Sequence, residues 1–186
     1  SDLFATGIRE REITLFIAQF LFVWAYAASI FLFPSFLREV RALDALNFSL
    51  LIGAGNAIGV LGYGLAAWIG ERVWTRRNTV VLWTLLGAFL FQALVWVPTT
   101  FGQILFVYAL MSMFFYGSAA VKFAYLAEVF PTRIRALAMA CCGSLAVTLG
   151  SAAGPYTVSL AIESWGWHLG YATLVGVPLA LAGLLY

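Results

Sequence analysis

The chain has 186 residues, of which 63% are hydrophobic and 10% are charged, and its formal net charge is +2. A mean hydropathy of +0.97, together with apolar runs of about 18 residues or more, indicates an integral membrane protein rather than a soluble domain. The arginines are scattered around the apolar runs, so no DNA or RNA partner is expected. His168 is the only histidine, and Cys141 and Cys142 are adjacent within an apolar run. We therefore expect no metal ion and no cofactor.

Hydropathy predicts six membrane-spanning helices, which form one domain over residues 1–186. The expected ranges, in chain order, are 13–36, 47–69, 79–98, 102–127, 134–160 and 168–186. Each is long enough to cross about 30 Å of hydrocarbon. Because the connections are short, successive helices are expected to be antiparallel neighbours. The predicted fold class is therefore an all-α polytopic membrane protein.

Arginines gather at one set of helix ends. This set holds Arg9, Arg11, Arg72, Arg76, Arg77, Arg133 and Arg135, whereas the opposite ends hold Arg38 and Arg41. The Arg-rich side is expected to be cytoplasmic, in a plasma membrane of the bacterial inner-membrane type. Residues 13–98 and 102–186 are two similar lengths of three helices each, entering from opposite sides. This pattern predicts a 3+3 inverted repeat.

Polar residues are concentrated on the first, second, fourth and fifth predicted helices, where they recur at spacings of three and four. Polar groups are costly in lipid, so these stripes are expected to face protein or water. Each residue alone also fits ordinary helix packing. The set of stripes predicts a substrate cavity, and it leaves the third and sixth helices to face lipid. The predicted cavity residues are Gln19, Tyr26, Asn56, Tyr108, Ser112, Tyr116, Lys122 and Thr148.

Acids and arginines also cluster in the two loops on the Arg-rich side. One interpretation is topology alone, in which positive residues are retained on the cytoplasmic side. The other is an ion-pair network, because Glu71 and Glu128 each lie at a helix end beside arginines. The predicted network consists of Glu71, Arg72, Arg76, Arg77, Glu128, Arg133 and Arg135.

The segment AEVFPTRIRALA, which contains Glu128, Pro131, Arg133 and Arg135, resembles a loop of the major facilitator superfamily. That loop joins the fourth and fifth helices of the C-terminal half in the sugar-porter and aromatic-acid:proton symporter-like branches. The resemblance covers the whole chain in helix number, loop lengths and orientation. It implies half of a twelve-helix transporter, with substrate bound between two halves that rock to give alternating access.

A second segment, GLAAWIGERVWTRRNT, resembles the same half's degenerate copy of the superfamily's cytoplasmic signature between its second and third helices. It departs from the pattern where Trp74 and Thr75 replace the usual glycine and where Ala67 replaces another, so a tight turn after Arg72 is not assured. By this resemblance, the charged residues of the two loops form a cytoplasmic gate network. They fasten the cytoplasmic side in the outward-open state and do not bind substrate.

Lys122 is the only lysine, and its position near the membrane boundary allows two interpretations. Its side chain either extends into cytoplasmic water or faces the cavity, where it attracts an anionic substrate or stabilises an occluded state. No predicted helix has an acid near its middle. If transport is proton-coupled, as in the branch that the chain resembles, the titrating group is expected in the N-terminal half.

The leading interpretation is thus half of a proton-coupled secondary transporter for a small organic solute, with a carboxylate or aromatic acid as the substrate class. An intramembrane enzyme is disfavoured, since the serines have no partner histidine at membrane depth. The alternative is a self-standing six-helix unit that acts as a homodimer or a channel. The expected partners are the lipid bilayer, the small-molecule substrate, and either the missing N-terminal half or a second copy of the chain.

Overall fold

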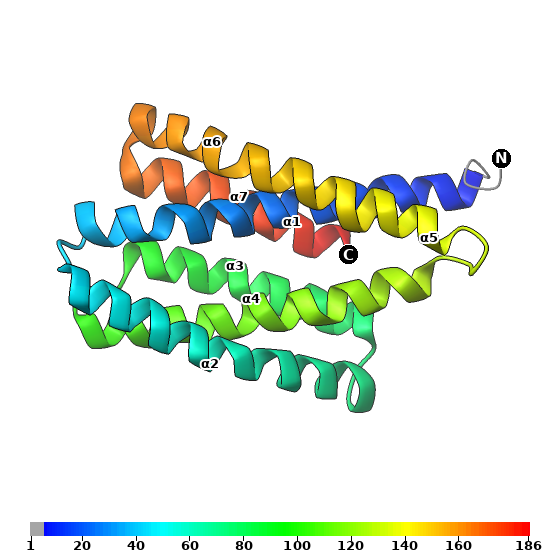
Figure 1. Cartoon of the computed structure of the whole chain (residues 1–186), viewed down its shortest axis with the longest axis horizontal. Helices are drawn as coiled ribbons and strands as arrows, with labels where there is room; N and C mark the ends of the chain where they lie inside the picture. The colour runs from blue at the N-terminus through cyan, green and yellow to red at the C-terminus, as the bar shows by residue number, and fades with distance from the viewer. Residues whose placement is uncertain (1–5) are drawn as a thin grey trace.

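The computed structural model describes the backbone of residues 6–186 and the side chains from residue 9 onward. This part of the chain is a bundle of long helices without strands, which confirms the predicted all-α class (Figure 1). The elements are α1 (Thr6–Glu39), α2 (Ala45–Arg72), α3 (Arg76–Trp96), α4 (Phe101–Val129), α5 (Arg135–Ala138), the π-helical segment η2 (Met139–Leu145), α6 (Ala146–Gly166), a second π-helical segment η3 (Trp167–Tyr171), and α7 (Ala172–Leu185).

Five helical stretches are long and apolar enough to cross a membrane, and the last of them runs from Arg135 to Leu185 over 51 residues. This last stretch reverses direction at Gly166, whose φ of 79° suits a residue without a Cβ. As a result, α6 and α7 run antiparallel and the chain crosses the bundle six times (Figure 1). Helices α1, α2 and α4 extend beyond the predicted ranges at both ends, because helical hydrogen bonding continues into polar flanks that hydropathy does not detect. Helix α3 begins before its predicted range and ends at Trp96, two residues before the predicted end.

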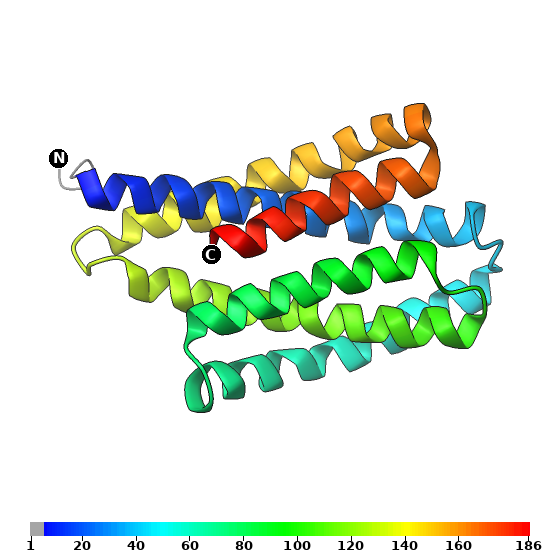
Figure 2. The same cartoon turned by 180° about the vertical axis from the view of Figure 1, so that it is seen from behind.

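The six crossings form two layers. In Figure 1, α1 and α4 lie in the middle of the near face, with α6 beside α1 and α2 beside α4. Figure 2 shows the opposite face, where α3 and α7 lie in front. Helix α3 packs against both α4 and α7, and α7 packs against α1. We call the side formed by α1, α2, α4 and α6 the front face.

The packing is symmetric between the first three crossings and the last three. Helix α1 packs on α6 and α7, which belong to the second set, whereas α4 packs on α2 and α3, which belong to the first. Exchanging α1 with α4, α2 with α6, and α3 with α7 therefore turns the α2–α4 contact into the α1–α6 contact and the α3–α4 contact into the α1–α7 contact. The α3–α7 contact maps onto itself. This relation fits the predicted inverted repeat, because each set of three buries its apolar surface against the other.

Glycines allow the two closest helix crossings in the bundle. On α2, a Cβ added at Gly62 would overlap the backbone of Met113 on α4. On α6, a Cβ added at Gly154 would overlap the backbone of Trp24 on α1. Small residues let membrane helices approach until their backbones touch, which increases van der Waals contact where no hydrophobic effect acts between helices. The α2–α4 and α1–α6 pairs depend on these contacts.

Aromatic rings join α1 to α4 in the middle of the bundle. Phe33 stacks on Tyr108 with ring centroids 4.5 Å apart. Nearer the Arg-rich end, Tyr26 meets Phe115 at 5.8 Å. Each aromatic pair contributes about 0.5–1.5 kcal/mol beyond the area it buries. These pairs hold the two central helices together and fix which of their faces remain on the front.

Large apolar side chains are exposed on both layers. On the rear, Phe89 of α3 is 70% exposed and Leu184 of α7 is 69% exposed. Exposure of this kind suits contact with lipid. However, α2 and α6 also expose large apolar side chains, including Leu61 and Tyr156. Exposed apolar side chains are therefore not confined to α3 and α7.

Candidate functional site

A cluster of tyrosines surrounds Asn56 on the front face. The Asn56 Oδ1 atom accepts hydrogen bonds from the Tyr108 hydroxyl at 3.0 Å and the Tyr116 hydroxyl at 2.9 Å. The ring of Tyr63 stacks on that of Tyr116, with centroids 5.5 Å apart and planes 9° apart. Tyr26 reaches this region from α1, and its ring lies 5.8 Å from that of Phe115 on α4. The structure thus brings together residues from three helices.

The local sequence positions this cluster. Gly55 and Gly59 flank Asn56 on α2, and the rings of Tyr108 and Tyr116 occupy the space where their side chains would be. Because both hydroxyls donate to the same oxygen, the orientation of the Asn56 amide is fixed. The amide nitrogen then has two N–H donors left for another partner. Asn56 is half-buried, so these donors are within reach of a ligand on the front face.

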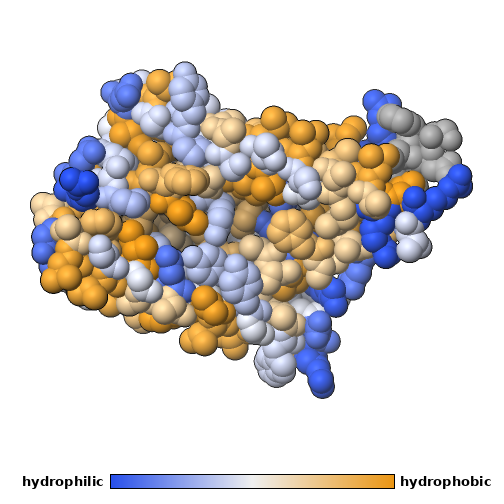
Figure 3. All heavy atoms as spheres, in the orientation of Figure 1, coloured by the Kyte–Doolittle hydropathy of each residue, from blue (hydrophilic) through white to orange (hydrophobic). Residues whose placement is uncertain are grey.

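A cavity of about 360 Å³ lies between α1, α4 and the start of α6. Its walls are mainly apolar, and α1 contributes Gln19 and Tyr26 as its polar groups. Figure 3 shows the front face, where pale residues interrupt the apolar surface near the middle of the molecule. A mainly apolar pocket with few polar groups is typical of a site for a small organic ligand.

Lys122 lies inside the bundle beside this cavity. Its side chain is only 1% exposed, so it does not extend into solvent at the Arg-rich end, and that alternative was wrong. The Nζ atom lies 2.6 Å from the centroid of the Phe22 ring and 5.9 Å from that of Tyr186. Within the described residues, Nζ has no hydrogen-bond partner. Lys122 is therefore a buried amine with aromatic rings beside its nitrogen.

Three other predicted cavity residues occupy different surroundings. Gln19 is buried and accepts a hydrogen bond from the Tyr186 hydroxyl at 2.5 Å, although it also lines the cavity. Ser112 is buried where α4 meets Gly59 of α2, so it serves helix packing. Thr148 is exposed and donates to the carbonyl of Ser144 in its own helix. The predicted set is thus divided between the cluster, the cavity, the α2–α4 contact and the surface of α6.

At the Arg-rich end, one arginine joins two acids from the ends of different helices. Arg76 places one guanidinium nitrogen 2.8 Å from Glu128 and another 3.4 Å from Glu71. The side chains of Glu71 and Glu128 are 60% and 58% exposed, whereas that of Arg76 is 29% exposed. Exposed ion pairs each contribute about 0.2–1 kcal/mol. The bridge therefore joins the end of α2 and the start of α3 to the end of α4 with modest energy.

The other arginines predicted for this network lie elsewhere or bond differently. Arg77 donates to the backbone carbonyl of Tyr186 at 2.7 Å, and Arg135 donates to that of Phe130 at 3.4 Å. Arg72 is exposed at the end of α2, and Arg133 lies in the loop between α4 and α5. Among the ion pairs described here, Arg76 is thus the arginine that contacts both Glu71 and Glu128.

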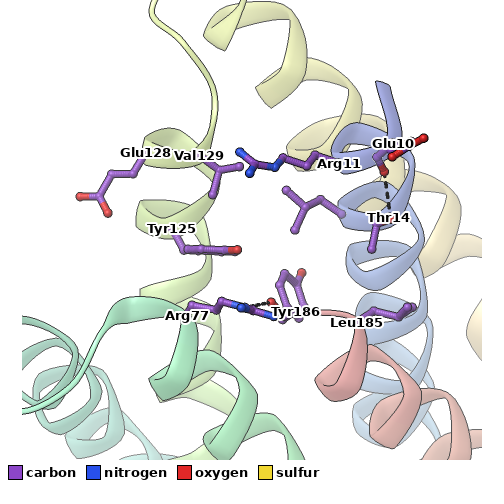
Figure 4. Close-up of a pocket in the computed structure, with 10 residues that line it drawn as sticks. Glu10, Arg11, Thr14, Arg77, Tyr125, Glu128, Val129, Leu185 and Tyr186 are labelled. Carbon is purple, nitrogen blue, oxygen red and sulfur yellow. Dashed lines mark hydrogen bonds between the residues drawn. The ribbon is translucent and has the colours of Figure 1, made fainter. Parts of the chain in front are cut away.

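A wider cavity of about 710 Å³ opens beside this network. Figure 4 shows Arg11 reaching from α1 toward α4, with Tyr125 and Arg77 below it. The carboxylate of Glu128 points away from the cavity, toward the side where Arg76 binds it. The arginines that line this cavity therefore lie apart from the bridge.

Two residues that shape the site were not among the predicted cavity residues. Tyr63 follows Asn56 by seven positions, so the helical stripe on α2 already contained it. Phe22 lies between Gln19 and Tyr26 on one face of α1, at spacings of three and four. That signal places Phe22 in the cavity wall. It does not reveal that the ring covers a lysine from another helix.

The comparison with known families agrees with this architecture. The family model described as Major Facilitator Superfamily matches residues 15–186. No curated protein matches the chain. The matched region includes every residue of the tyrosine cluster, the cavity beside Lys122 and the Arg76 bridge. The chain therefore belongs to the major facilitator superfamily of membrane transporters.

Proposed function

We propose that this chain is the C-terminal half of a secondary active transporter that moves a small organic solute by alternating access. The observation that carries the proposal is the Asn56 amide, which two tyrosines orient on α2, together with a mainly apolar cavity between α1, α4 and α6. In the six-helix unit this face lies at the surface. A second six-helix half covers it in the complete protein and encloses the substrate between the two halves.

The substrate class that fits this face best is a carboxylate or an aromatic acid. Tyr26, Tyr63 and Tyr116 offer aromatic surface, and Lys122 is the one ammonium side chain in the chain. Coupling to protons needs a group that titrates within the membrane. Because the described spans hold no acid near their middle, we assign that group to the N-terminal half. The Arg-rich end is then cytoplasmic.

The substitution Asn56→Ala tests the proposed site. It removes the oriented amide and leaves the Tyr108 and Tyr116 hydroxyls without their shared acceptor. We expect uptake to fall by roughly 5- to 150-fold, since a lost hydrogen-bonding group that leaves its partners unsatisfied costs about 1–3 kcal/mol. The measurement is uptake of a panel of radiolabelled organic acids, sugars and amides into proteoliposomes that contain the full-length protein.

Asn47→Ala is the matched control, because Asn47 is exposed at the start of the same helix and should not affect uptake. Equal uptake by the Asn56→Ala variant and the wild type would exclude a role for the cluster in binding. Failure of the full-length protein to transport any solute of the panel would contradict the proposed function itself.

The Arg76 bridge is proposed to act as the cytoplasmic gate. Arg76→Gln removes both ion pairs, and we expect the inward-open population to rise by roughly 2- to 30-fold, from about 0.2–1 kcal/mol per exposed pair. Arg72→Gln removes the same charge without breaking the bridge, so its population should stay close to that of the wild type. Distances between spin labels on the two halves measure these populations. Identical shifts in both variants would show that net charge, and not the bridge, sets the equilibrium.

A further inference from the structure

The surroundings of Lys122 lack a group that balances its charge. No carboxylate of the described residues forms an ion pair with it, and its Nζ atom has no hydrogen-bond acceptor there. An isolated buried ammonium is costly, and an aromatic ring compensates for only part of that cost. The face of the Phe22 ring lies against the ammonium, 2.6 Å from Nζ to the ring centroid. The site therefore favours the arrival of an anion.

Neighbours of Lys122 line the cavity between α1, α4 and α6. Phe22 and Gln19, about one turn apart on α1, both line the cavity, as do Ala119 and Phe123, which flank Lys122 on α4. Since the Phe22 ring lies directly against Nζ, this ring separates the ammonium from the cavity. Movement of one side chain would place the charge in the cavity wall.

The hydrogen-bond donors of Lys122 and Gln19 determine which class of ligand fits at this end of the cavity. Gln19 uses its Oε1 atom to accept from the Tyr186 hydroxyl, which leaves its amide N–H groups for a ligand. Lys122 and Gln19 then present donors only, so the ligand must supply acceptors and a negative charge. A carboxylate has both. The apolar remainder of the cavity suits an organic body, and a single ammonium balances one negative charge rather than two.

We propose that Lys122 and Gln19 form a subsite for the carboxylate of an organic monocarboxylate, and that Phe22 covers it until the ligand arrives. When the ligand binds, the Phe22 ring moves aside and the carboxylate takes its place beside the Lys122 ammonium. This inference rests on the proposed transport function, which it deepens by assigning the ligand's charged group to particular residues. The tyrosine cluster around Asn56 is a separate part of the front face.

The test is binding of simple probes to the full-length protein in detergent. Calorimetry measures benzoate and hexanoate as monocarboxylates, benzamide as the neutral analogue of benzoate, and phthalate as a dicarboxylate. We expect a monocarboxylate to bind more tightly than benzamide and phthalate. Equal affinity for benzoate and benzamide, or no binding of either monocarboxylate by the wild type, overturns the proposal.

Two substitutions separate the roles of the lysine and the ring. Lys122→Gln should weaken monocarboxylate binding by roughly 10- to 150-fold, because it removes a charged hydrogen bond. Phe22→Leu should tighten binding by roughly 2- to 30-fold, because binding no longer has to break the cation–π contact between Lys122 and the ring. Phe22→Tyr keeps the ring and is the matched control, and size-exclusion chromatography reports whether each variant folds. Unchanged affinity in Lys122→Gln overturns the subsite.

The outcome also distinguishes this subsite from the transport function. If the full-length protein takes up a neutral solute, depends on Asn56, and is indifferent to Lys122→Gln, the carboxylate subsite is wrong while the transporter proposal stands. If monocarboxylates bind at Lys122 but no solute of the panel is transported, the subsite stands and the transport proposal fails.

Discussion

Replacing Gly62 by alanine should destabilise the protein by about 1–3 kcal/mol, the usual cost of overpacking a well-packed interface. The added Cβ would overlap the carbonyl and Cα of Met113, which are backbone atoms that no side-chain rotation can move. Helices α2 and α4 must therefore separate, and this displaces Asn56 from Tyr108 and Tyr116. We expect a lower midpoint in thermal unfolding of the full-length protein, together with reduced uptake.

Gly64→Ala provides the control on the same helix. A Cβ at Gly64 meets nothing within 4 Å, so the substitution changes the composition of α2 without changing its packing. Alanine is also a better helix former than glycine by about 1 kcal/mol. The Gly64→Ala variant should be as stable as the wild type or slightly more so. An equal loss of stability in both variants would contradict this account, because Gly64→Ala introduces no contact with α4.

Replacing Lys122 by methionine should make the protein more stable while removing monocarboxylate binding. A lysine within a membrane helix costs about 2.5–3.5 kcal/mol at the centre of the bilayer and less toward the boundary, where Lys122 lies. Its contact with the Phe22 ring offsets about 0.5–2 kcal/mol of that cost. Methionine has a similar length and no charge, so we expect a net gain of up to about 3 kcal/mol. Chemical unfolding of the full-length protein in detergent measures the gain.

Lys122→Arg keeps the charge and should bring no such gain. A loss of stability in Lys122→Met would contradict this account, since it would mean that another part of the full-length protein already balances the ammonium. The expected pairing of higher stability with lost binding is characteristic of a residue kept for function, because functional sites often retain groups that the fold alone disfavours.

The helices of this fold are readable from the sequence because long apolar segments in a bilayer have few alternatives to the helix. The reversal at Gly166 was expected between residues 160 and 168, and the structure places it there. The π-helical segment Met139–Leu145 was not predicted. Its hydrogen-bond register depends on how the chain meets α1 and α4, and the sequence carries no periodic signal for that choice.

The candidate site shows where such prediction stops. Asn56, Tyr108 and Tyr116 lie on polar stripes, and the structure brings them into one hydrogen-bonded cluster. Ser112 shares the stripe of Tyr108 but is buried against α2, because a stripe specifies one face of a helix and not which neighbour covers each position. The contact of Phe22 with Lys122 joins residues 100 positions apart in the chain, and only the packing of α1 against α4 reveals it.

The sequence also did not show which arginine forms the bridge to Glu71 and Glu128. Arg72, Arg76 and Arg77 are all close to Glu71 in sequence. The sequence alone therefore does not show which of them binds the Glu71 carboxylate. Successive residues of a helix point about 100° apart, which means that Arg76 and Arg77 at the start of α3 face different neighbours. Arg76 reaches Glu71 and Glu128, whereas Arg77 reaches the end of α7.

The most direct test of the account is the water accessibility of its two faces in the full-length protein. Single cysteines at Asn56 and Thr148 on the front, and at Phe89 and Leu184 on the rear, are reacted with a water-soluble thiol reagent after the native cysteines have been replaced by alanine. We predict labelling of the two front positions and no labelling of the two rear positions. Labelling of the rear positions with none at the front would contradict a solute pathway along α1, α2, α4 and α6.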